Sequence, residues 1–283
     1  MIRFPRAVIV GLAAWVGVAQ PEPLAAQTGW RLLPDRSLLP KLVAGPREPA
    51  TAAKLVFVAN SPTRFGEVLE GEAAIGGSLP AYLLAGQTQQ DGLVVGVEGG
   101  VFARFNMETK ERDLIATDWI FAVPLVLHRG EHWFRLRYYH TSAHMGDEYL
   151  ERFELQRVDF ARDELEALAY VRIGSGLGVY GGGGWAFRVD PTGAKRLTVR
   201  GGAELEALAL LGPLRPYAAA DVQLEQDNDW EPRLNLQAGL RFLPFNGQRG
   251  VRIAIELLTG PSPQGQFHGD RTAFIALGMF LDL

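Results

Sequence analysis

The chain has 283 residues, with 28 Lys and Arg against 32 Asp and Glu, a formal net charge of −4, and no cysteine. The absence of cysteine excludes disulfides and thiolate metal sites, and the acidic balance argues against nucleic acid as a partner. The length allows either one large β domain or two ordinary domains.

The first 26 residues have the pattern of a secretory signal peptide. Arg3 and Arg6 precede an apolar run from Ala7 to Ala19, and Leu24-Ala25-Ala26 forms a small-residue cleavage site. The run is shorter than the roughly 20 residues of a transmembrane anchor, so the pattern predicts export. No later apolar stretch has the length of a membrane-spanning helix, and any insertion into a membrane therefore requires a closed barrel.

Residues 27–52 form a Pro-rich segment without the alternation of a strand. Leu38, Leu39 and Leu42 within it could dock on a neighbouring structure. We expect an irregular N-terminal lead-in that caps or plugs the domain that follows. A plain linker is the alternative.

Residues 53–283 have the composition of a β domain. Segments dense in Val, Leu, Ile, Ala and aromatic residues alternate with loops built from Gly, Pro, Asp and Asn. The pattern predicts an all-β fold, an antiparallel transmembrane β-barrel of about 12 strands. The expected strands lie at 53–60, 70–84, 92–105, 115–127, 132–142, 164–173, 177–188, 196–210, 215–225, 233–243, 250–258 and 272–283.

The strands have one apolar and one charged face. Every second residue from Arg233 to Phe242 is apolar, and Ile253 and Ile255 oppose Arg252 and Glu256. A soluble periplasmic barrel or sandwich would turn the apolar faces inward, and alternation alone does not distinguish the two. Strand length, charges of both signs on the polar faces, and links that alternate between short and long favour an outer-membrane barrel.

The last strand supports this interpretation. Ile275, Leu277, Met279 and Leu281 share one face, as in the terminal recognition signal of outer-membrane barrels, although the chain ends in Leu283 rather than the usual Phe. We therefore expect insertion by the barrel-assembly machinery, a location in the outer membrane, and outer-membrane lipid around the wall.

Four motifs carry a resemblance to a known family. They are Gly29–Pro34 (GWRLLP), Ala44–Pro49 (AGPREP), Tyr139–Glu148 (YHTSAHMGDE) and Val179–Trp185 (VYGGGGW). Together they resemble the bacterial family DUF1207 over nearly the whole mature chain. The resemblance implies an exported, barrel-like protein and brings no activity with it.

A candidate catalytic pair lies at the end of the strand predicted at 132–142. His140 and Ser142 share its apolar face, which is predicted to face lipid at the outer rim. An imidazole beside a hydroxyl can activate it for acyl transfer once a third group orients the ring, and Glu154, Glu148 and Asp147 are the candidates for that role.

The His-x-Ser pair is similar to that of outer-membrane phospholipase A and of the lipid A 3-O-deacylases, which act on acyl esters from the outer wall of a barrel. The resemblance implies a lipid acyl-ester hydrolase with Ser142, His140 and Glu154. Both families continue with Asn, where this chain has Ala143. The alternative for the pair is a hydrogen bond that orders the outer loop.

Two further hypotheses concern charged groups. His144, Asp147 and Glu148 could bind a divalent cation, because oxygen ligands with one imidazole suit such an ion; no other cofactor is expected. A charged and narrow lumen is predicted from Glu98, Arg104, Arg135, Arg137, Arg172, Arg200, Glu204, Glu206, Arg233, Arg241, Arg252 and Glu256.

The leading hypothesis is an outer-membrane barrel with a structural role, a small pore or a surface for interaction. Opposite charges in a lumen of this size would pair and close it, which disfavours a wide porin. The hydrolase is the second hypothesis. Trp119, Phe121, Tyr138, Trp185 and Phe187 are candidate membrane-interface anchors, with ordinary core aromatics as the alternative.

Overall fold

A computed structural model describes residues 29–85, 91–157, 159–206, 213–243 and 250–282. The predicted signal peptide lies outside the described residues. Within the described part of the chain, no helix has the length and apolarity needed to cross a membrane.

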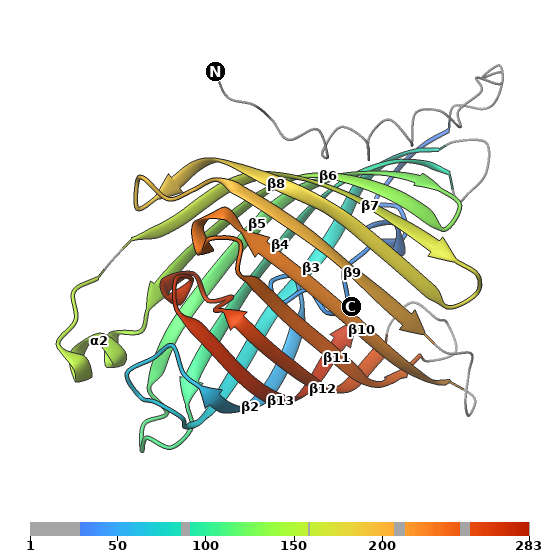
Figure 1. Cartoon of the computed structure of the whole chain (residues 1–283). Helices are drawn as coiled ribbons and strands as arrows, with labels where there is room; N and C mark the ends of the chain where they lie inside the picture. Colours follow the sequence, from blue (N-terminus) through green and yellow to red (C-terminus); the bar gives the residue numbers. More distant parts are fainter. Residues whose placement is uncertain (1–28, 86–90, 158, 207–212, 244–249, 283) are drawn as a thin grey trace.

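Twelve long strands form one closed antiparallel β-barrel, which confirms the predicted fold (Figure 1). Each strand pairs with the next along the chain, and the barrel closes where β13 pairs with β2. A short extra strand, β1, pairs with the end of β3. The strands are β1 Trp30–Leu32, β2 Thr51–Asn60, β3 Leu69–Ala85, β4 Gly92–Asn106, β5 Leu114–Arg129, β6 His132–Met145, β7 Phe160–Ile173, β8 Leu177–Asp190, β9 Leu197–Glu206, β10 Leu214–Glu225, β11 Pro232–Phe242, β12 Gly250–Pro261 and β13 Arg271–Asp282.

The two ends of the barrel differ in their connections. Tight turns at 130–131 and 174–176 begin with Gly130 and Gly174, which have φ values of 58° and 60° that suit glycine. We call this the turn end. The opposite end, called the α2 end, carries longer connections with short helices: α2 Asp147–Phe153, η2 Gln226–Asn228 and η3 Gly265–Phe267. A further short helix in the described part of the chain, η1 Arg36–Leu38, follows β1.

The faces of the strands are oriented as an outer-membrane-type barrel requires. On β12, Ile253 and Ile255 point outward with 58% and 55% of their surface exposed, while Arg252 and Glu256 on either side of them are buried in the lumen. A soluble barrel would have the reverse arrangement, because its apolar side chains form the interior. The wall is therefore an apolar belt around a charged interior.

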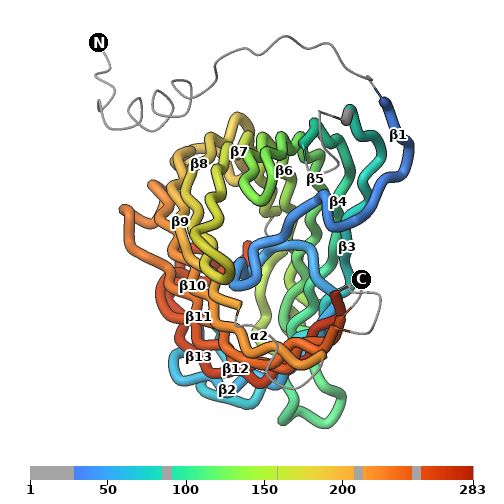
Figure 2. Tube along the Cα trace, turned by 90° about the vertical axis from the view of Figure 1, so that its right-hand side faces the viewer, coloured from blue at the N-terminus to red at the C-terminus, as the bar shows by residue number. Residues whose placement is uncertain are grey.

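Residues 35–50, which we call the plug, enter the barrel and fill part of the lumen, as Figure 2 shows for the chain between β1 and β2. Leu39 and Leu42 of the plug are buried against side chains of the wall such as Trp133 and Leu168. Because this apolar cluster lies inside the barrel, the interior is a packed core toward the turn end.

Hydrogen bonds from the wall hold the irregular backbone of the plug. Asn235 Nδ2 donates to the carbonyl of Ala44 at 2.7 Å, and the hydroxyl of Tyr139 donates to the carbonyl of Arg47 at 2.9 Å. The backbone N–H of Val43 donates to Glu204 Oε1 at 2.6 Å. These bonds satisfy polar backbone groups that neither a strand nor a helix pairs, and burial would otherwise make those groups costly.

Candidate functional site

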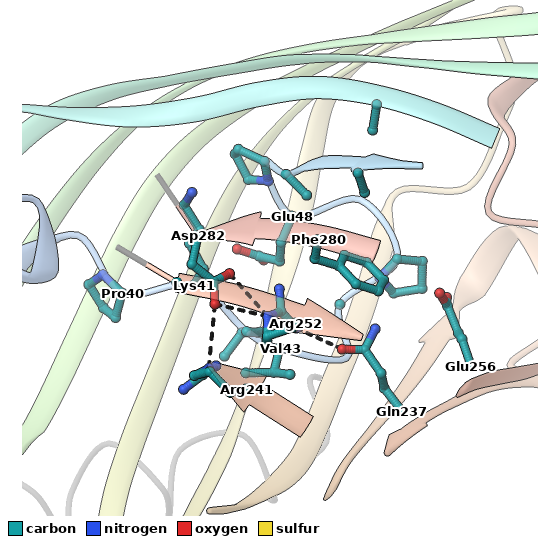
Figure 3. Close-up of a pocket in the computed structure, with 18 of the residues that line it drawn as sticks. Pro40, Lys41, Val43, Glu48, Gln237, Arg241, Arg252, Glu256, Phe280 and Asp282 are labelled. Carbon is teal, nitrogen blue, oxygen red and sulfur yellow. Dashed lines mark hydrogen bonds and ion pairs between the residues drawn. The ribbon is translucent and has the colours of Figure 1, made fainter. Parts of the chain in front are cut away.

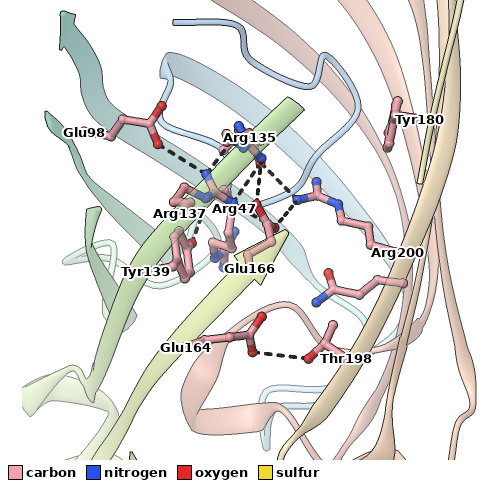
Figure 4. A network of polar contacts seen from close by, with 12 residues as sticks. Arg47, Glu98, Arg135, Arg137, Tyr139, Glu164, Glu166, Tyr180, Thr198 and Arg200 are labelled. Atoms are coloured by element: carbon pink, nitrogen blue, oxygen red, sulfur yellow. Dashed lines mark hydrogen bonds and ion pairs between the residues drawn. The ribbon is translucent and has the colours of Figure 1, made fainter. Parts of the chain in front are cut away.

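An ion-pair network joins the plug to the wall in the middle of the lumen. Glu48 of the plug meets three arginines, with Oε1 at 3.1 Å from Arg135 Nη2, 3.2 Å from Arg137 Nη2 and 2.9 Å from Arg200 Nη1. Glu166 of β7 bonds to the same arginines from the wall side (Figure 4). Ion pairs therefore connect the plug to the barrel wall across the lumen.

The charge of Glu48 is fixed by these neighbours. Burial alone would raise its pKa, but the guanidinium groups of Arg135, Arg137 and Arg200 outweigh that effect and hold the pKa of Glu48 well below its usual range. The carboxylate therefore stays ionised and keeps its three partners across the neutral and mildly acidic range.

The strand alternation turns the predicted lumen charges inward. The buried ones are Glu98, Arg104, Arg135, Arg137, Arg200, Arg233, Arg252 and Glu256. The half-buried ones are Arg172, Glu204, Glu206 and Arg241. Most are paired within the chain: Arg241 meets Glu206, and Arg137 meets Glu98 at 3.2 Å.

Cavities lie on either side of the plug in the part of the chain that the structure describes. The larger, about 520 Å³, lies between the plug and β11–β13, and its wall carries Arg252, Gln237 and Asp282 (Figure 3). The smaller, about 110 Å³, lies between the plug and the α2 end and is lined by Tyr139 and Arg162 among others. The plug separates these two spaces.

The outer face of β6 carries a second polar cluster. Leu136, Tyr138, His140 and Ser142 follow one another on this face, as the alternation predicts, and Leu136 is exposed. In register with β5, His140 lies opposite Phe121 and Ser142 lies opposite Trp119. The imidazole and the hydroxyl thus sit among outward-facing aromatic side chains near the α2 end.

Asp163 of β7 orients the imidazole. It is the register partner of His140, and its Oδ1 lies 2.7 Å from His140 Nδ1. The hydroxyl of Tyr138 donates to the same oxygen at 2.7 Å. A carboxylate can only accept, so Nδ1 carries the proton, and in the neutral form of the ring Nε2 is the acceptor. Ser142 lies two residues along the same face, roughly 6.5 Å away along the strand.

Glu154 does not have the place expected for it. It follows α2 in a left-handed conformation (φ 51°) with its side chain exposed, whereas the carboxylate bonded to His140 is Asp163. The physical reason is that β7 begins at Phe160, earlier than the predicted 164. The longer strand brings Asp163 out of the expected loop and into register with His140.

The proposed cation ligands are not gathered either. Asp147 bonds to Arg157, and His144 is an exposed residue on the outer face of β6. Glu148 is exposed in the first turn of α2. In the described residues, no group of three or more His, Asp or Glu side chains is arranged to hold a metal ion.

A β-bulge places Arg188 beside this cluster. The β7–β8 register shifts between Asp163, which pairs with Arg188, and Glu164, which pairs with Ala186. Ala186 is buried in the lumen, so alternation would turn Arg188 inward as well. The extra residue, Phe187, reverses this, and Arg188 points outward with 72% of its side chain exposed and Nη1 3.8 Å from Asp163 Oδ2.

The candidate interface aromatics form a connected patch on the same outer wall. The ring centroids of Phe121 and Tyr138 are 6.5 Å apart, those of Tyr138 and Phe187 are 6.2 Å apart, and those of Trp185 and Phe187 are 6.2 Å apart. Trp119 is also exposed on this wall. Their outward placement near one rim is the arrangement of an aromatic girdle.

Sequence reasoning missed the residues whose roles depend on pairing. Asp163, Arg188 and Glu48 are each charged, but the first falls in a predicted loop, the second points outward because of a bulge, and the third sits in a segment without periodicity. A longer β7 would have been found by following the alternation Arg162, Glu164, Glu166 backward from the strand.

The architecture and the orientation of its faces define an outer-membrane-type β-barrel. Within that class the chain belongs to the family described as protein of unknown function DUF1207, whose model matches residues 15–282. No curated protein matches the chain significantly.

Solved structures similar to the chain are outer-membrane proteins. Outer membrane phospholipase A from Escherichia coli aligns with a TM-score of 0.56 and 12% identity over 84% of this chain and 93% of that one. The calcium-bound dimer of the Salmonella typhi phospholipase has a TM-score of 0.54 and 12% identity over 84% and 93%. The NalP translocator domain from Neisseria meningitidis has 0.40 and 14% over 98% and 91%. At 12% identity, the likeness to the two phospholipase structures shows the fold alone.

Proposed function

We propose that this protein is an outer-membrane hydrolase of lipid acyl esters, with Ser142 as nucleophile, His140 as general base and Asp163 as the group that orients the imidazole. The single observation that carries the proposal is the 2.7 Å contact between His140 Nδ1 and Asp163 Oδ1 on the outward face, two residues from Ser142. A Ser–His–Asp arrangement is recognised by geometry and roles rather than by sequence order.

The reaction follows from these positions. His140 Nε2 takes the proton of Ser142 Oγ as that oxygen attacks the ester carbonyl, and the bond to the lipid alcohol breaks as His140 returns the proton to it. Water then attacks the acyl-enzyme with His140 again as base, which releases the fatty acid and restores Ser142. Asp163 stays ionised and stabilises the imidazolium that forms in each half-reaction.

The site faces outward, which suits a substrate drawn from the lipid that surrounds the barrel wall. A lipid ester near the α2 end can reach Ser142 laterally from the membrane, between Trp119 and the surface of β7. The fold similarity to outer membrane phospholipase A supports this reading. We place the protein in the outer membrane, exported by the signal peptide at 1–26 and inserted by the barrel-assembly machinery.

The ion pairs between the plug and the wall argue against a pore. The plug, Glu48 and its three arginines occupy the cross-section that a solute would need. The second candidate function is a purely structural or surface role, which requires the barrel but does not require Ser142. The two candidates differ in a measurement on the purified protein.

The test is hydrolysis of phospholipid in mixed micelles by the purified chain and by Ser142→Ala. We expect Ser142→Ala to lower kcat by about 10³-fold or more. The matched control is Thr141→Val, which changes the neighbouring hydroxyl on the lumenal face of the same strand and should retain activity. Equal fatty-acid release from wild type and Ser142→Ala would remove the hydrolase and leave the structural role.

A further inference from the structure

We infer that Arg188 binds the phosphate of a lipid headgroup and thereby selects phosphate-bearing acyl esters as substrates of the Ser142 site. The inference rests on the proposed function and adds the chemical class of the substrate. It starts from the β8 bulge, which turns this arginine out of the lumen.

The bulge in β8 determines the direction in which Arg188 points. Bulges re-aim side chains and occur often beside active sites. If β8 continued its regular alternation through Phe187 without a bulge, Arg188 would share the lumenal face of Ala186, on which Glu164 and Arg162 form a pair at 2.9 Å. The structure instead exposes a guanidinium on the outer wall, next to the carboxylate that orients His140.

The outward position of Arg188 has an energetic cost. A charged side chain on the lipid face of a barrel is destabilising except near the interface, where polar headgroups meet it. Arg188 lies two residues from the end of β8, and the exposed aromatic residues Trp185 and Phe187 precede it on the same strand. This is the level of headgroup phosphates, for which a guanidinium is a preferred ligand because it donates two parallel hydrogen bonds.

Asp163 is not a sufficient partner for Arg188. The contact is 3.8 Å, longer than a hydrogen bond, and the arginine side chain is 72% exposed. Asp163 already accepts hydrogen bonds from Tyr138 and His140 through its other oxygen. Most of the donors of Arg188 therefore face away from the protein wall.

Arg188 and the Ser142 site are close enough for one lipid molecule to contact both. Neighbouring strands lie about 4.8 Å apart, so the backbones of His140 and Arg188, on either side of β7, are roughly 10 Å apart. A long arginine side chain can span most of this gap along the wall. The phosphate of a glycerophospholipid is separated from its acyl esters by the glycerol unit alone, so one lipid can contact both residues.

The experiment compares two substrates with the same acyl esters. Dioleoylphosphatidylglycerol carries the phosphate, and dioleoylglycerol lacks it; both are presented to the full chain in neutral-detergent micelles. We expect Arg188→Gln to lower kcat/KM for the phospholipid about tenfold, mainly through KM, as for the loss of one charge-assisted contact. Hydrolysis of dioleoylglycerol should be unchanged, and Arg188→Lys should recover part of the loss.

The control is Arg271→Gln, which removes another exposed arginine at the α2 end, paired with Glu231 across the barrel from the site. Arg271→Gln should leave the hydrolysis of both substrates unchanged. An equal loss on both substrates in Arg188→Gln would mean that Arg188 acts only through Asp163, and no loss on either would mean that it binds no headgroup; both results overturn the inference.

A binding measurement separates this inference from the proposed function. Native mass spectrometry on Ser142→Ala and on Ser142→Ala with Arg188→Gln counts retained dioleoylphosphatidylglycerol. We expect less retention when Arg188 is absent, whether or not the wild type hydrolyses lipid. Equal retention overturns the headgroup site, while absent hydrolysis with Arg188-dependent retention overturns only the esterase.

Discussion

Strand β6 separates two polar clusters on its two faces, and they differ in what their charges contact. On the inner face, Arg135 and Arg137 bond to Glu48 and Glu166, so their charges hold one part of the chain against another. On the outer face, His140 bonds to Asp163 on the adjacent strand and holds no distant segment. Lumenal charges therefore hold the plug against the wall, whereas the outer pair joins only two neighbouring strands that the backbone already pairs.

This comparison predicts opposite phenotypes for changes on the two faces. Outer-face variants should lose activity and keep stability, because strand pairing of β6 and β7 depends on the backbone. Lumenal variants should lose stability and the seal of the barrel while the outer wall keeps its catalytic geometry. An outer-face variant that unfolds the barrel, or a lumenal variant that abolishes activity in a stable barrel, would contradict this division.

The largest expected effect is that of Asp163→Asn. The amide cannot hold Nδ1 protonated in the same way, so the imidazole is presented in the wrong tautomer, and kcat should fall by about 10⁴-fold. Thermal unfolding should be close to that of wild type. The measurement is single-turnover lipid hydrolysis together with a heat-modifiability gel; retained activity with a lowered unfolding temperature would assign Asp163 to structure.

That prediction concerns a residue that local reading of the sequence misplaced. Alternation of period two is a local signal, and it was sufficient to predict the twelve strands, their two faces and the inward charges such as Arg252. Strand register and bulges depend on pairing with a neighbour, which one strand does not encode. A β7 that starts at 164 leaves Asp163 in a loop, and Asp163 is therefore absent from the candidates Glu154, Glu148 and Asp147, whereas the strand begins at Phe160.

The plug illustrates the same limit over a longer range. Its Pro-rich sequence has no periodicity, and the contacts of Glu48 are made with residues far away along the chain. Composition could suggest a cap, a plug or a linker, but the partners in the lumen follow only from the closed barrel. Exposed surface residues such as Arg188 also required the folded wall, since the bulge changes which side they face.

The second effect in size is that of Glu48→Gln. Removing this charge leaves Arg135, Arg137 and Arg200 with fewer partners in a buried site, which should cost about 3 to 5 kcal/mol of unfolding free energy. We also expect anion-selective conductance in planar bilayers, because uncompensated arginines would line the space freed when the plug loosens. A silent bilayer with unchanged unfolding would show that Glu48 does not hold the plug.

The effect of Glu48→Gln on stability should depend on pH. The folded pKa of Glu48 is depressed, so its contribution is present above the unfolded pKa of about 4.3 and is lost only as pH falls through the lower folded value. The difference in unfolding temperature between wild type and Glu48→Gln should therefore be equal at pH 7 and pH 6 and shrink in stronger acid. A difference that disappears already at pH 6 would contradict this.

The smallest expected effect is that of Tyr138→Phe on the outer face. The hydroxyl of Tyr138 donates to the Asp163 oxygen that also meets His140, so its removal loosens the carboxylate without touching the substrate. One such bond corresponds to about 1 kcal/mol, so kcat should fall roughly fivefold with KM unchanged. In the Asp163→Asn background the same change should have almost no effect, because residues that act through one another are not additive. Equal losses in both backgrounds would show that Tyr138 acts as a membrane anchor and not through Asp163.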